Sequence, residues 1–293
     1  MILLERKVPS NFNLFLFSDE HIGNRSFSWD GWNKLVDMML SPYDGLPARV
    51  NFGVDGGDFA ESIYLDDPRF EPEFHVLPDG KEVKIPSAFK QVEEGVQMRL
   101  PIADRLVTVL EGNHPMKLWR IGNMTQELCK RLNVKYGTWS CKITWKDKHG
   151  KPLFKSYHTH GKKLIKSGAK DPKQRINNMR LSLKEHLRYK FADTMLMCKS
   201  HTHLLLVCKP ESELYLTDDG AKIKQNYTSV NQTDKFIHSD QRFYVNTGSF
   251  LRLYGVMGAS SYAEIAEYDP IQIGFAIAKI RDRKLIDVDE VPL

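Results

Sequence analysis

Three times in the first 115 residues, a hydrophobic run passes directly into a short polar motif. The runs FLF, NFGV and VTVL are followed by SDEH (18–21), DGGD (55–58) and EGNH (111–114). Short apolar runs rich in Val, Leu and Phe predict buried strands. Because α/β sheets carry their ligands and chemistry in the loops that follow strands, we expect these polar motifs to lie together at one edge of a sheet.

Two histidine-rich clusters follow later in the chain, YHTHG (157–161) and SHTH (200–203). Imidazole, carboxylate and amide groups together suit divalent metal ions, and a carboxylate can bridge two ions because it has two oxygens. Two ions about 3.5–4 Å apart can activate a water molecule and bind a phosphate during in-line attack. The five clusters therefore predict a two-metal site and phosphoester hydrolysis.

A closed zinc site in CKSHTHLLLVC (198–208) is the alternative for the last cluster. Such sites usually take their ligands from turns, whereas Leu204–Val207 predicts a continuous buried strand. Alternation along that strand would place His201 and His203 on one face and Cys208 on the other. We therefore expect the four cysteines to be free, buried thiols, as is common in a chain of this length.

Elsewhere the pattern alternates strands and helices early and becomes strand-rich later. Expected strands cover 13–17, 49–54, 106–110, 192–203, 203–210, 213–217, 242–254 and 271–280. Expected helices cover 29–40, 87–103, 125–132 and 172–189. A hairpin over 141–161 turns at 147–150, and 66–85 is a loop or hairpin. This mixture predicts an α/β fold with a two-sheet β-sandwich core flanked by helices. We expect a single domain over 1–293 with a basic insertion at about 142–190.

The ordered set SDEH, GGD, GNH, HG and SHTH resembles the calcineurin-like metallophosphoesterase superfamily, and the chain is most similar to its compact bacterial and phage members. The NTGS sequence at 246–249 resembles a turn that often follows in bacterial members. The resemblance implies metal ligation by Asp19, His21, Asp58, Asn113, His160, His201 and His203. Asp58 would bridge the two ions, a metal-bridging hydroxide would attack, and His114 would stabilise or protonate the leaving oxygen.

The sequence departs from the superfamily pattern at two positions. Pro115 stands where many members have an acidic residue, so a supporting carboxylate is missing there or is supplied from elsewhere. Ser200 replaces a glycine without changing a ligand. In the fourth cluster His160 is preferred as the ligand because Gly161 follows it, and His158 stays open as the alternative.

The charge distribution bears on the substrate. The whole chain carries +5, but residues 142–190 hold 12 Lys and 3 Arg against three acids, so that segment carries +12 and the remainder −7. Such asymmetry favours a polyanionic partner, and we expect Lys162, Lys163 and Lys166 to contact substrate. A solvated lysine-rich face is the alternative. The interleaved aromatic residues could stack on bases or form the core face of the hairpin.

These features together predict a phosphodiesterase or nuclease that acts on DNA, RNA or a nucleotide-derived diester with two divalent ions. Manganese is the first expectation for the metal, and the same ligands also accept zinc, iron, nickel and cobalt. A phosphomonoesterase and a non-catalytic nucleic-acid-binding module are the alternatives. No signal peptide or membrane-length apolar window is present, so we expect a cytoplasmic location, no membrane association and no obligate protein partner.

Overall fold

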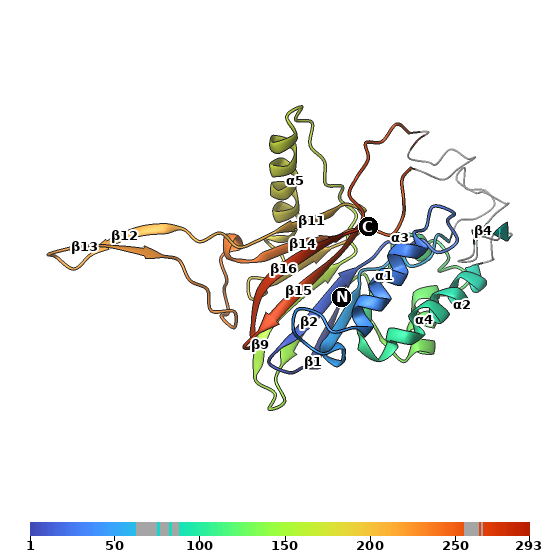
Figure 1. Ribbon diagram of the computed structural model, residues 1–293, viewed down its shortest axis with the longest axis horizontal. Helices are drawn as coiled ribbons and strands as arrows, with labels where there is room; N and C mark the ends of the chain where they lie inside the picture. The colour runs from blue at the N-terminus through green and yellow to red at the C-terminus, as the bar shows by residue number, and fades with distance from the viewer. Residues whose placement is uncertain (63–74, 77–81, 84–87, 255–263, 265) are drawn as a thin grey trace.

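Two six-stranded sheets form the centre of the computed structural model (Figure 1). The described residues are 1–62, 75–76, 82–83, 88–254, 264 and 266–293. The first sheet has the order β16-β15-β2-β3-β6-β7. Its strands are β2 (Phe12–Phe17), β3 (Asn51–Asp55), β6 (Leu106–Val109), β7 (Lys135–Tyr136), β15 (Gly274–Arg281) and β16 (Lys284–Pro292). β2, β3, β6 and β7 run parallel, and β15 is antiparallel to both of its neighbours.

The second sheet has the order β1-β8-β9-β10-β14-β11. Its strands are β1 (Ile2–Lys7), β8 (Ser140–Lys146), β9 (Pro152–Thr159), β10 (Leu196–Lys199), β11 (Leu205–Cys208) and β14 (Phe243–Thr247). β9, β10 and β14 are parallel to one another. One of the five polar motifs lies at the carboxyl end of each of β2, β3, β6, β9 and β10, and β14 runs into the NTGS turn.

Helices cover the outer faces of both sheets. They are α1 (Trp29–Leu40), α2 (Ala88–Arg99), α3 (Asn113–Met116), α4 (Met124–Leu132) and α5 (Pro172–Leu187), with 3-10 turns at Ala48–Val50, Leu100–Arg105 and Ser239–Gln241. In Figure 1, α1, α2 and α4 lie on one side of the molecule and α5 on the other. The predicted α/β class, with two packed sheets between helices, is confirmed.

The main core lies between the sheets because both present apolar side chains inward. Leu14 and Leu16 of β2 pack there with Trp145 of β8 and Val245 of β14. On the outer faces, Phe15 and Phe17 of β2 pack against α1, and separate clusters lie under α2 with α4 and under α5. Burial of alternate faces fixes the register of each strand, and with it the position of the loop that follows.

Some predicted elements differ from the structure. β1 and β16 were not predicted, because each is an edge strand in which charged residues interrupt the apolar pattern. In β16 the apolar residues Leu285, Val288 and Val291 are nevertheless buried. Trp145 and Phe154 are fully buried, which confirms the core interpretation for those two hairpin aromatics. Residues 142–190 contribute most of β8, all of β9 and α5. The predicted excursion 66–85 lies outside the described residues, apart from β4 (His75–Val76) paired with β5 (Glu82–Val83).

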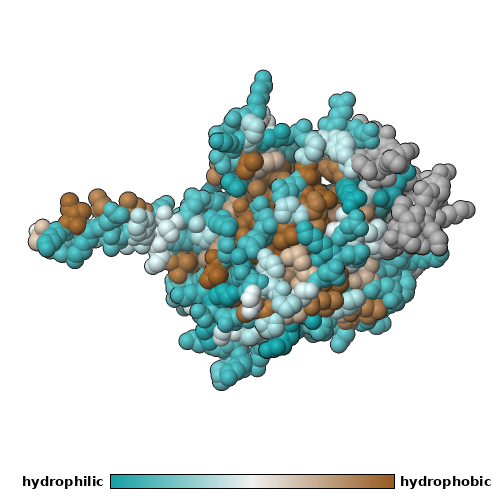
Figure 2. Space-filling view, viewed as in Figure 1, coloured by the Kyte–Doolittle hydropathy of each residue, from teal (hydrophilic) through white to brown (hydrophobic). Residues whose placement is uncertain are grey.

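A two-stranded arm projects from the body (Figure 1, left). It consists of β12 (Leu214–Asp218) and β13 (Ile223–Tyr227), which pair antiparallel. Several large hydrophobic side chains on this arm are exposed, namely Leu214, Leu216, Ile223 and Tyr227. Figure 2 shows hydrophobic surface on the arm. Among the described helices, none is both long enough and apolar enough to cross a bilayer.

Candidate metal centre

The loops after β2, β3, β6, β9 and β10 bring the five polar motifs together. Three overlapping groups of possible metal donors occur among the described residues, each with its ligand atoms within 4.8 Å of one another. The groups are Asp19, His21 and His203; His21, Asp58 and His114; and Asp58, His160 and His201. Asp58 belongs to two of the groups and therefore lies between the other donors.

The first group directs electron-pair donors at a common point. His21 Nε2 lies 3.1 Å from His203 Nε2, and Asp19 Oδ1 lies 3.5 Å from His203 Nε2. Asp19 Oδ1 is buried and accepts no hydrogen bond from the described residues. Two imidazole nitrogens that face each other beside an unpaired buried carboxylate oxygen fit a cation at that point, because a cation satisfies all three.

The group of Asp58, His160 and His201 has the same property. His160 Nε2 lies 3.1 Å from both Asn113 Oδ1 and Asp58 Oδ2. On the other side of the ring, His160 Nδ1 lies 2.9 Å from the Gly56 carbonyl oxygen and can only donate to it. A neutral His160 therefore carries its lone pair on Nε2, next to two oxygen acceptors. These residues fit a second divalent ion.

The electrostatics of the two groups depend on burial and on the carboxylates. Burial lowers the pKa of His160, but the adjacent Asp58 carboxylate outweighs burial and raises that pKa to about 9. Conversely, burial opposes ionisation of Asp58, and His160 lowers its pKa. Burial lowers the pKa of His201 and of His203 to about 4. Without a metal, His160 is thus protonated at neutral pH and pairs with Asp58, so an ion that binds here displaces that proton.

Five of these residues have left-handed backbone conformations, which side chains other than glycine rarely adopt. Their φ angles lie between 53° and 75°; the residues are Asp19, His21, Asp58, His201 and His203. Each such residue costs about 1–3 kcal/mol relative to a relaxed backbone, and such conformations cluster at functional sites. The left-handed backbone lets side chains two positions apart, such as Asp19 and His21, point toward the same site.

The expected strand placement of His201 and His203 is wrong. Both lie in the loop between β10 and β11, since β11 begins only at Leu205. Their positive φ angles, rather than strand alternation, bring the two rings to the site. Cys208 lies in β11 with its Sγ 3.8 Å from the Arg180 carbonyl oxygen. All four cysteines are free and buried, as predicted.

The structure brings His160, and not His158, to the donor cluster. His158 points into the protein from β9, and its Nε2 lies 2.8 Å from Ser156 Oγ. Ser156 Oγ also accepts a hydrogen bond from Trp145 Nε1 at 2.8 Å. Burial lowers the pKa of His158 to about 3. This histidine is therefore a neutral, hydrogen-bonded member of the interior.

Glu61 is a site residue that we did not predict. Its Oε2 lies 2.7 Å from His21 Nδ1, and its carbonyl oxygen accepts a hydrogen bond from His114 Nδ1 at 2.7 Å. Its Oε1 lies 3.7 Å from the same His114 atom. Glu61 thus supplies the carboxylate that Pro115 does not. The sequence feature that could have indicated this role is the position of Glu61 three residues after Asp58.

His114 is the second residue of the short helix α3 and belongs to the donor cluster of His21 and Asp58. Its backbone N–H donates to Asp58 Oδ1 at 2.8 Å, and its ring packs edge-on against His21 with centroids 4.5 Å apart. Burial and the neighbouring His21 lower the pKa of His114. Gly112 is required here because a Cβ on it would lie 1.9 Å from Asp58 Oδ1.

Hydroxyl groups connect the two sheets directly under the site. Thr247 Oγ1 lies 2.6 Å from Ser18 Oγ and 2.9 Å from Ser200 Oγ. Ser249 Oγ donates to the Asp19 carbonyl oxygen at 2.8 Å. The NTGS turn therefore positions the loops that carry Asp19 and His201, and Ser200 replaces glycine with a hydroxyl that joins this network.

Arg99 on α2 positions the same loops from the other side. This fully buried guanidinium binds Asp55 Oδ2 through Nε at 3.0 Å and Nη2 at 2.8 Å, and its Nη2 lies 2.9 Å from Glu20 Oε1. Asp55 Oδ1 accepts the Gly57 N–H at 3.0 Å. Burial and the Asp55 charge raise the pKa of Glu20 well above its usual value. Glu20 and Asp55 are therefore structural acids within two metal motifs.

The three lysines expected to contact substrate follow directly after His160. Lys162, Lys163 and Lys166 are exposed in the loop that leads from β9 to α5. Within the described part of the chain they form no ion pair with an acidic residue. The three side chains are therefore exposed and free of acidic partners among the described residues, in a loop that begins directly after His160.

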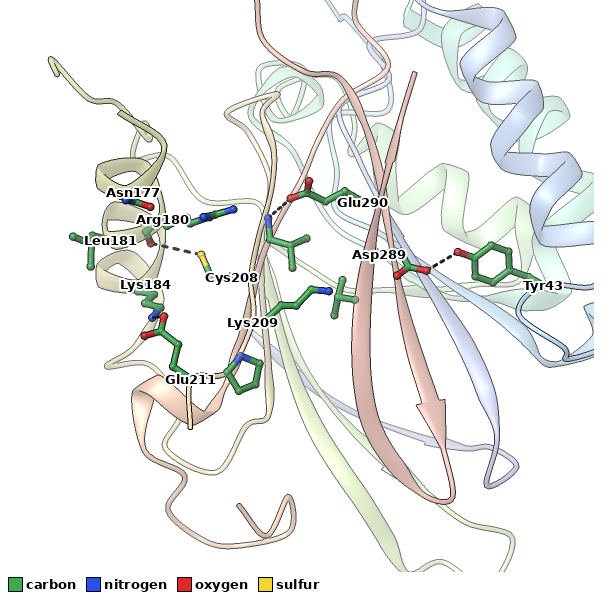
Figure 3. Close-up of a pocket in the computed structure, with 13 residues that line it drawn as sticks. Tyr43, Asn177, Arg180, Leu181, Lys184, Cys208, Lys209, Glu211, Asp289 and Glu290 are labelled. Carbon is green, nitrogen blue, oxygen red and sulfur yellow. Dashed lines mark hydrogen bonds and ion pairs between the residues drawn. The ribbon is translucent and has the colours of Figure 1, made fainter. Parts of the chain in front are cut away.

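A separate pocket of about 820 Å³ lies between α5 and strands β11 and β16 (Figure 3). None of the metal-donor residues lines it. Its basic residues Arg180, Lys184 and Lys209 are matched by Glu211, Asp289 and Glu290. This balance gives the pocket no preference for a phosphate group.

No family model and no curated protein matches the chain. A solved structure from Streptococcus pneumoniae TIGR4, described as a conserved uncharacterized protein and predicted phosphoesterase, aligns with 97% of this chain and 98% of its own, at 11% identity and a TM-score of 0.30. The two-sheet fold and the buried His and Asp groups of the chain agree with the resemblance to calcineurin-like metallophosphoesterases that its motifs carry.

Proposed function

We propose that this chain is a phosphodiesterase that uses two divalent metal ions to hydrolyse nucleic acid or a nucleotide-derived diester. The observation that supports it is that Asp58 lies between two donor groups. It forms one cluster with His160 and His201, and another with His21, which also belongs to the group of Asp19 and His203. Both groups consist of electron-pair donors, and Asp58 has two oxygens with which to serve both. A structural metal site would need only one such group.

In this proposal, each ion has its own ligands. Asp19, His21 and His203 bind the first ion, Asn113, His160 and His201 bind the second, and Asp58 binds both. Manganese is the metal we propose, because the donors are imidazole nitrogens and oxygens without a thiolate. The bound ions would activate water and offset the negative charge of the phosphate.

The side chains of the chain itself provide the remaining chemistry. His114 lies beside the site with Nδ1 committed to the Glu61 carbonyl oxygen, so its Nε2 is the atom that can contact the leaving oxygen. Its lowered pKa favours the neutral ring, in which Nε2 carries a lone pair and no proton. His114 would therefore donate to the leaving oxygen only when the negative charge of the substrate phosphate raises that pKa. Glu61 and the His114 N–H bond to Asp58 hold the ring and the bridging carboxylate in fixed positions.

The choice of a diester in a polyanion rests on charge. The segment 142–190 carries +12 in a chain of +5, and its exposed residues Lys162, Lys163 and Lys166 follow His160 within six positions. A small phosphomonoester would not need such an extended positive surface, whereas a nucleic-acid backbone does.

Hydrolysis by metal-stripped protein reloaded with Mn²⁺ tests the proposal. The substrates are bis-p-nitrophenyl phosphate, p-nitrophenyl phosphate and labelled single- and double-stranded DNA. Asp58→Asn removes the shared charge, and Asp104→Asn is the matched control because Asp104 is 81% exposed. We expect diester and DNA hydrolysis that is lost in Asp58→Asn and retained in Asp104→Asn. Turnover of the monoester alone would indicate a phosphatase, and binding of DNA without turnover would indicate a binding module.

A further inference from the structure

The arm formed by β12 and β13 is an excursion from the edge of the second sheet. It leaves the sheet after β11 and returns before β14, and these two strands pair with each other. At its base the Glu211 N–H donates to the Asp240 carbonyl oxygen at 2.8 Å, and the Thr228 N–H donates to the Glu213 carbonyl oxygen at 2.9 Å. Among the described strands, β12 and β13 pair with each other alone. The arm therefore extends away from the sheet that carries it (Figure 1).

One face of the arm is apolar. Residues directly opposite each other in an antiparallel pair share a face, and so do residues two positions apart in one strand. The register places Leu214 opposite Tyr227 and Asp218 opposite Ile223, with Leu216 between them on the same face. The four apolar side chains of this face are between 53% and 75% exposed. Figure 2 shows hydrophobic surface along one side of the arm.

The opposite face is largely polar and forms hydrogen bonds within the arm. It carries Tyr215, Thr217, Lys224 and Asn226, because these residues alternate with the apolar ones. Asn226 Nδ2 donates to Thr217 Oγ1 at 2.8 Å, and Lys224 Nζ binds Asp219 Oδ2 at 2.8 Å. The arm is thus amphipathic, and its apolar face is the one that lacks a cover.

The charges of the arm nearly cancel. Residues 213–228 contain three acids, Glu213, Asp218 and Asp219, against the two lysines Lys222 and Lys224, which gives a net charge of −1. A surface of this kind does not attract a nucleic acid, whose binding depends on positive charge. Two copies of the arm would also repel each other only weakly.

The size of the apolar face fits contact with a second copy of itself. An isolated two-stranded hairpin is at best marginally stable in water, so a partner that covers the arm would stabilise it. Its four apolar side chains expose about 500 Å² together, which is near the upper end for one patch on a monomer. Two such faces in contact would bury about 1,000 Å², the smallest area typical of a specific interface. Two-fold symmetry makes each arm the partner of the other.

We propose that the apolar face of the arm packs against the same face of the arm in a second copy of this chain, which gives a symmetric dimer. β11 begins two residues after His203 and ends before the arm begins, so the metal donors lie at the other end of that strand. The dimer therefore leaves the metal centre open. This inference does not rest on the proposed function, because the oligomeric state is measured without a substrate.

The test compares substitutions at two adjacent positions of β12. Leu216→Lys places an ammonium group within the apolar face, whereas Thr217→Lys places the same group on the polar face and is the matched control. Both positions are exposed, so neither substitution disturbs the core. Circular dichroism checks the fold. The mass of each protein is measured by sedimentation at concentrations up to about 100 µM, where a weak dimer is populated.

We expect the wild type and Thr217→Lys to reach twice the 33.8 kDa of one chain at the highest concentration. Leu216→Lys should weaken dimer formation by about tenfold or more, because two like charges would meet in one apolar interface. Leu216→Glu should have the same effect. An equimolar mixture of Leu216→Lys and Leu216→Glu should restore the dimer, since the two opposite charges then face each other.

A wild type that stays monomeric would overturn the inference, as would a Leu216→Lys variant that dimerises as well as Thr217→Lys. If the mixture of the two charged variants stays monomeric, the arms do not face each other and the proposed contact is wrong. If a monomeric wild type sediments with phosphatidylcholine vesicles and Leu216→Lys does not, the apolar face binds lipid instead.

Discussion

At the scale of single residues, the site depends on groups that bind the ring nitrogens of the site histidines that face away from the proposed ions. Glu61 contacts both His21 and His114, and it fixes which ring nitrogen of each histidine carries the proton. Carboxylates in this position make the imidazole a stronger ligand and hold the ring in place. The position of Asp58 was evident from its motif, whereas the contacts of Glu61 depend on how two loops meet, and a single sequence does not contain that information.

Replacement of Glu61 by Gln should therefore lower Mn²⁺ affinity or kcat by about tenfold to a hundredfold, because the amide is neutral and supports His21 less well. Titration calorimetry with Mn²⁺ and diester hydrolysis both measure this effect. Glu127→Gln, at an exposed position on α4, is the matched control. Equal Mn²⁺ affinity and rate in the two variants would show that Glu61 plays no supporting role.

A second prediction at this scale concerns Gly112. An alanine Cβ there would lie 1.9 Å from Asp58 Oδ1 and must displace either the carboxylate or the loop. We expect Gly112→Ala to weaken Mn²⁺ binding by about tenfold or more. Gly168→Ala serves as control, since a Cβ at Gly168 meets nothing within 4 Å. If Gly112→Ala bound Mn²⁺ as tightly as Gly168→Ala, the described approach of this loop to Asp58 would be incorrect.

At the scale of elements, strand order explains why motifs far apart in the chain meet. β2, β3 and β6 are parallel in one sheet, and β9, β10 and β14 are parallel in the other. The apolar runs predicted most of these strands, and the two-sheet arrangement followed from their number and order. The loop conformation of His201 and His203 could not be predicted, because its left-handed backbone is set by tertiary contacts such as the His201 N–H bond to Asp19 Oδ2 at 3.1 Å.

α2 connects to two of these loops through Arg99, which lies between the buried carboxylates of Glu20 and Asp55. Arg99→Met leaves those carboxylates without their cation. We expect a loss of about 3–5 kcal/mol in the free energy of unfolding, measured by urea denaturation of metal-free protein. Arg131→Met removes a partly exposed ion pair with Glu93 and should lower the free energy of unfolding far less, because water screens exposed charges. Similar losses in the two variants would argue against a structural role for the buried ion cluster.

At the scale of the whole molecule, the interior between the sheets includes a histidine that must stay neutral. The pKa of His158 is about 3 in the folded protein because of burial, compared with about 6.5 in an unfolded chain. Between these values the unfolded chain binds a proton that the folded protein does not. Stability therefore falls as the pH drops from about 6.5 toward 3, by at most about 1.4 kcal/mol per pH unit for this one group.

The variant His158→Gln has no titrating ring, and its amide can still bond with Ser156. We expect its free energy of unfolding, measured with urea in the presence of a chelator, to depend less steeply on pH in this range than that of the wild type. Parallel pH profiles for the two proteins would show that His158 is not the buried neutral group described here.

Some features of the whole molecule could be predicted from the sequence and others could not. The α/β class and the clustered donors could be predicted because hydrophobic period and motif position are local signals. The projection of β12 and β13 from the body could not, since a strand pattern does not indicate whether the strand joins a sheet or pairs only with its neighbour.

The central claim is that Asp58 lies between two divalent ions. Anomalous X-ray diffraction from crystals of the protein soaked in Mn²⁺ tests it most directly. The account predicts two manganese peaks about 3.5–4 Å apart, one beside Asp19, His21 and His203 and one beside Asn113, His160 and His201, with the Asp58 carboxylate between them. A single peak, or manganese bound away from Asp58, would contradict it.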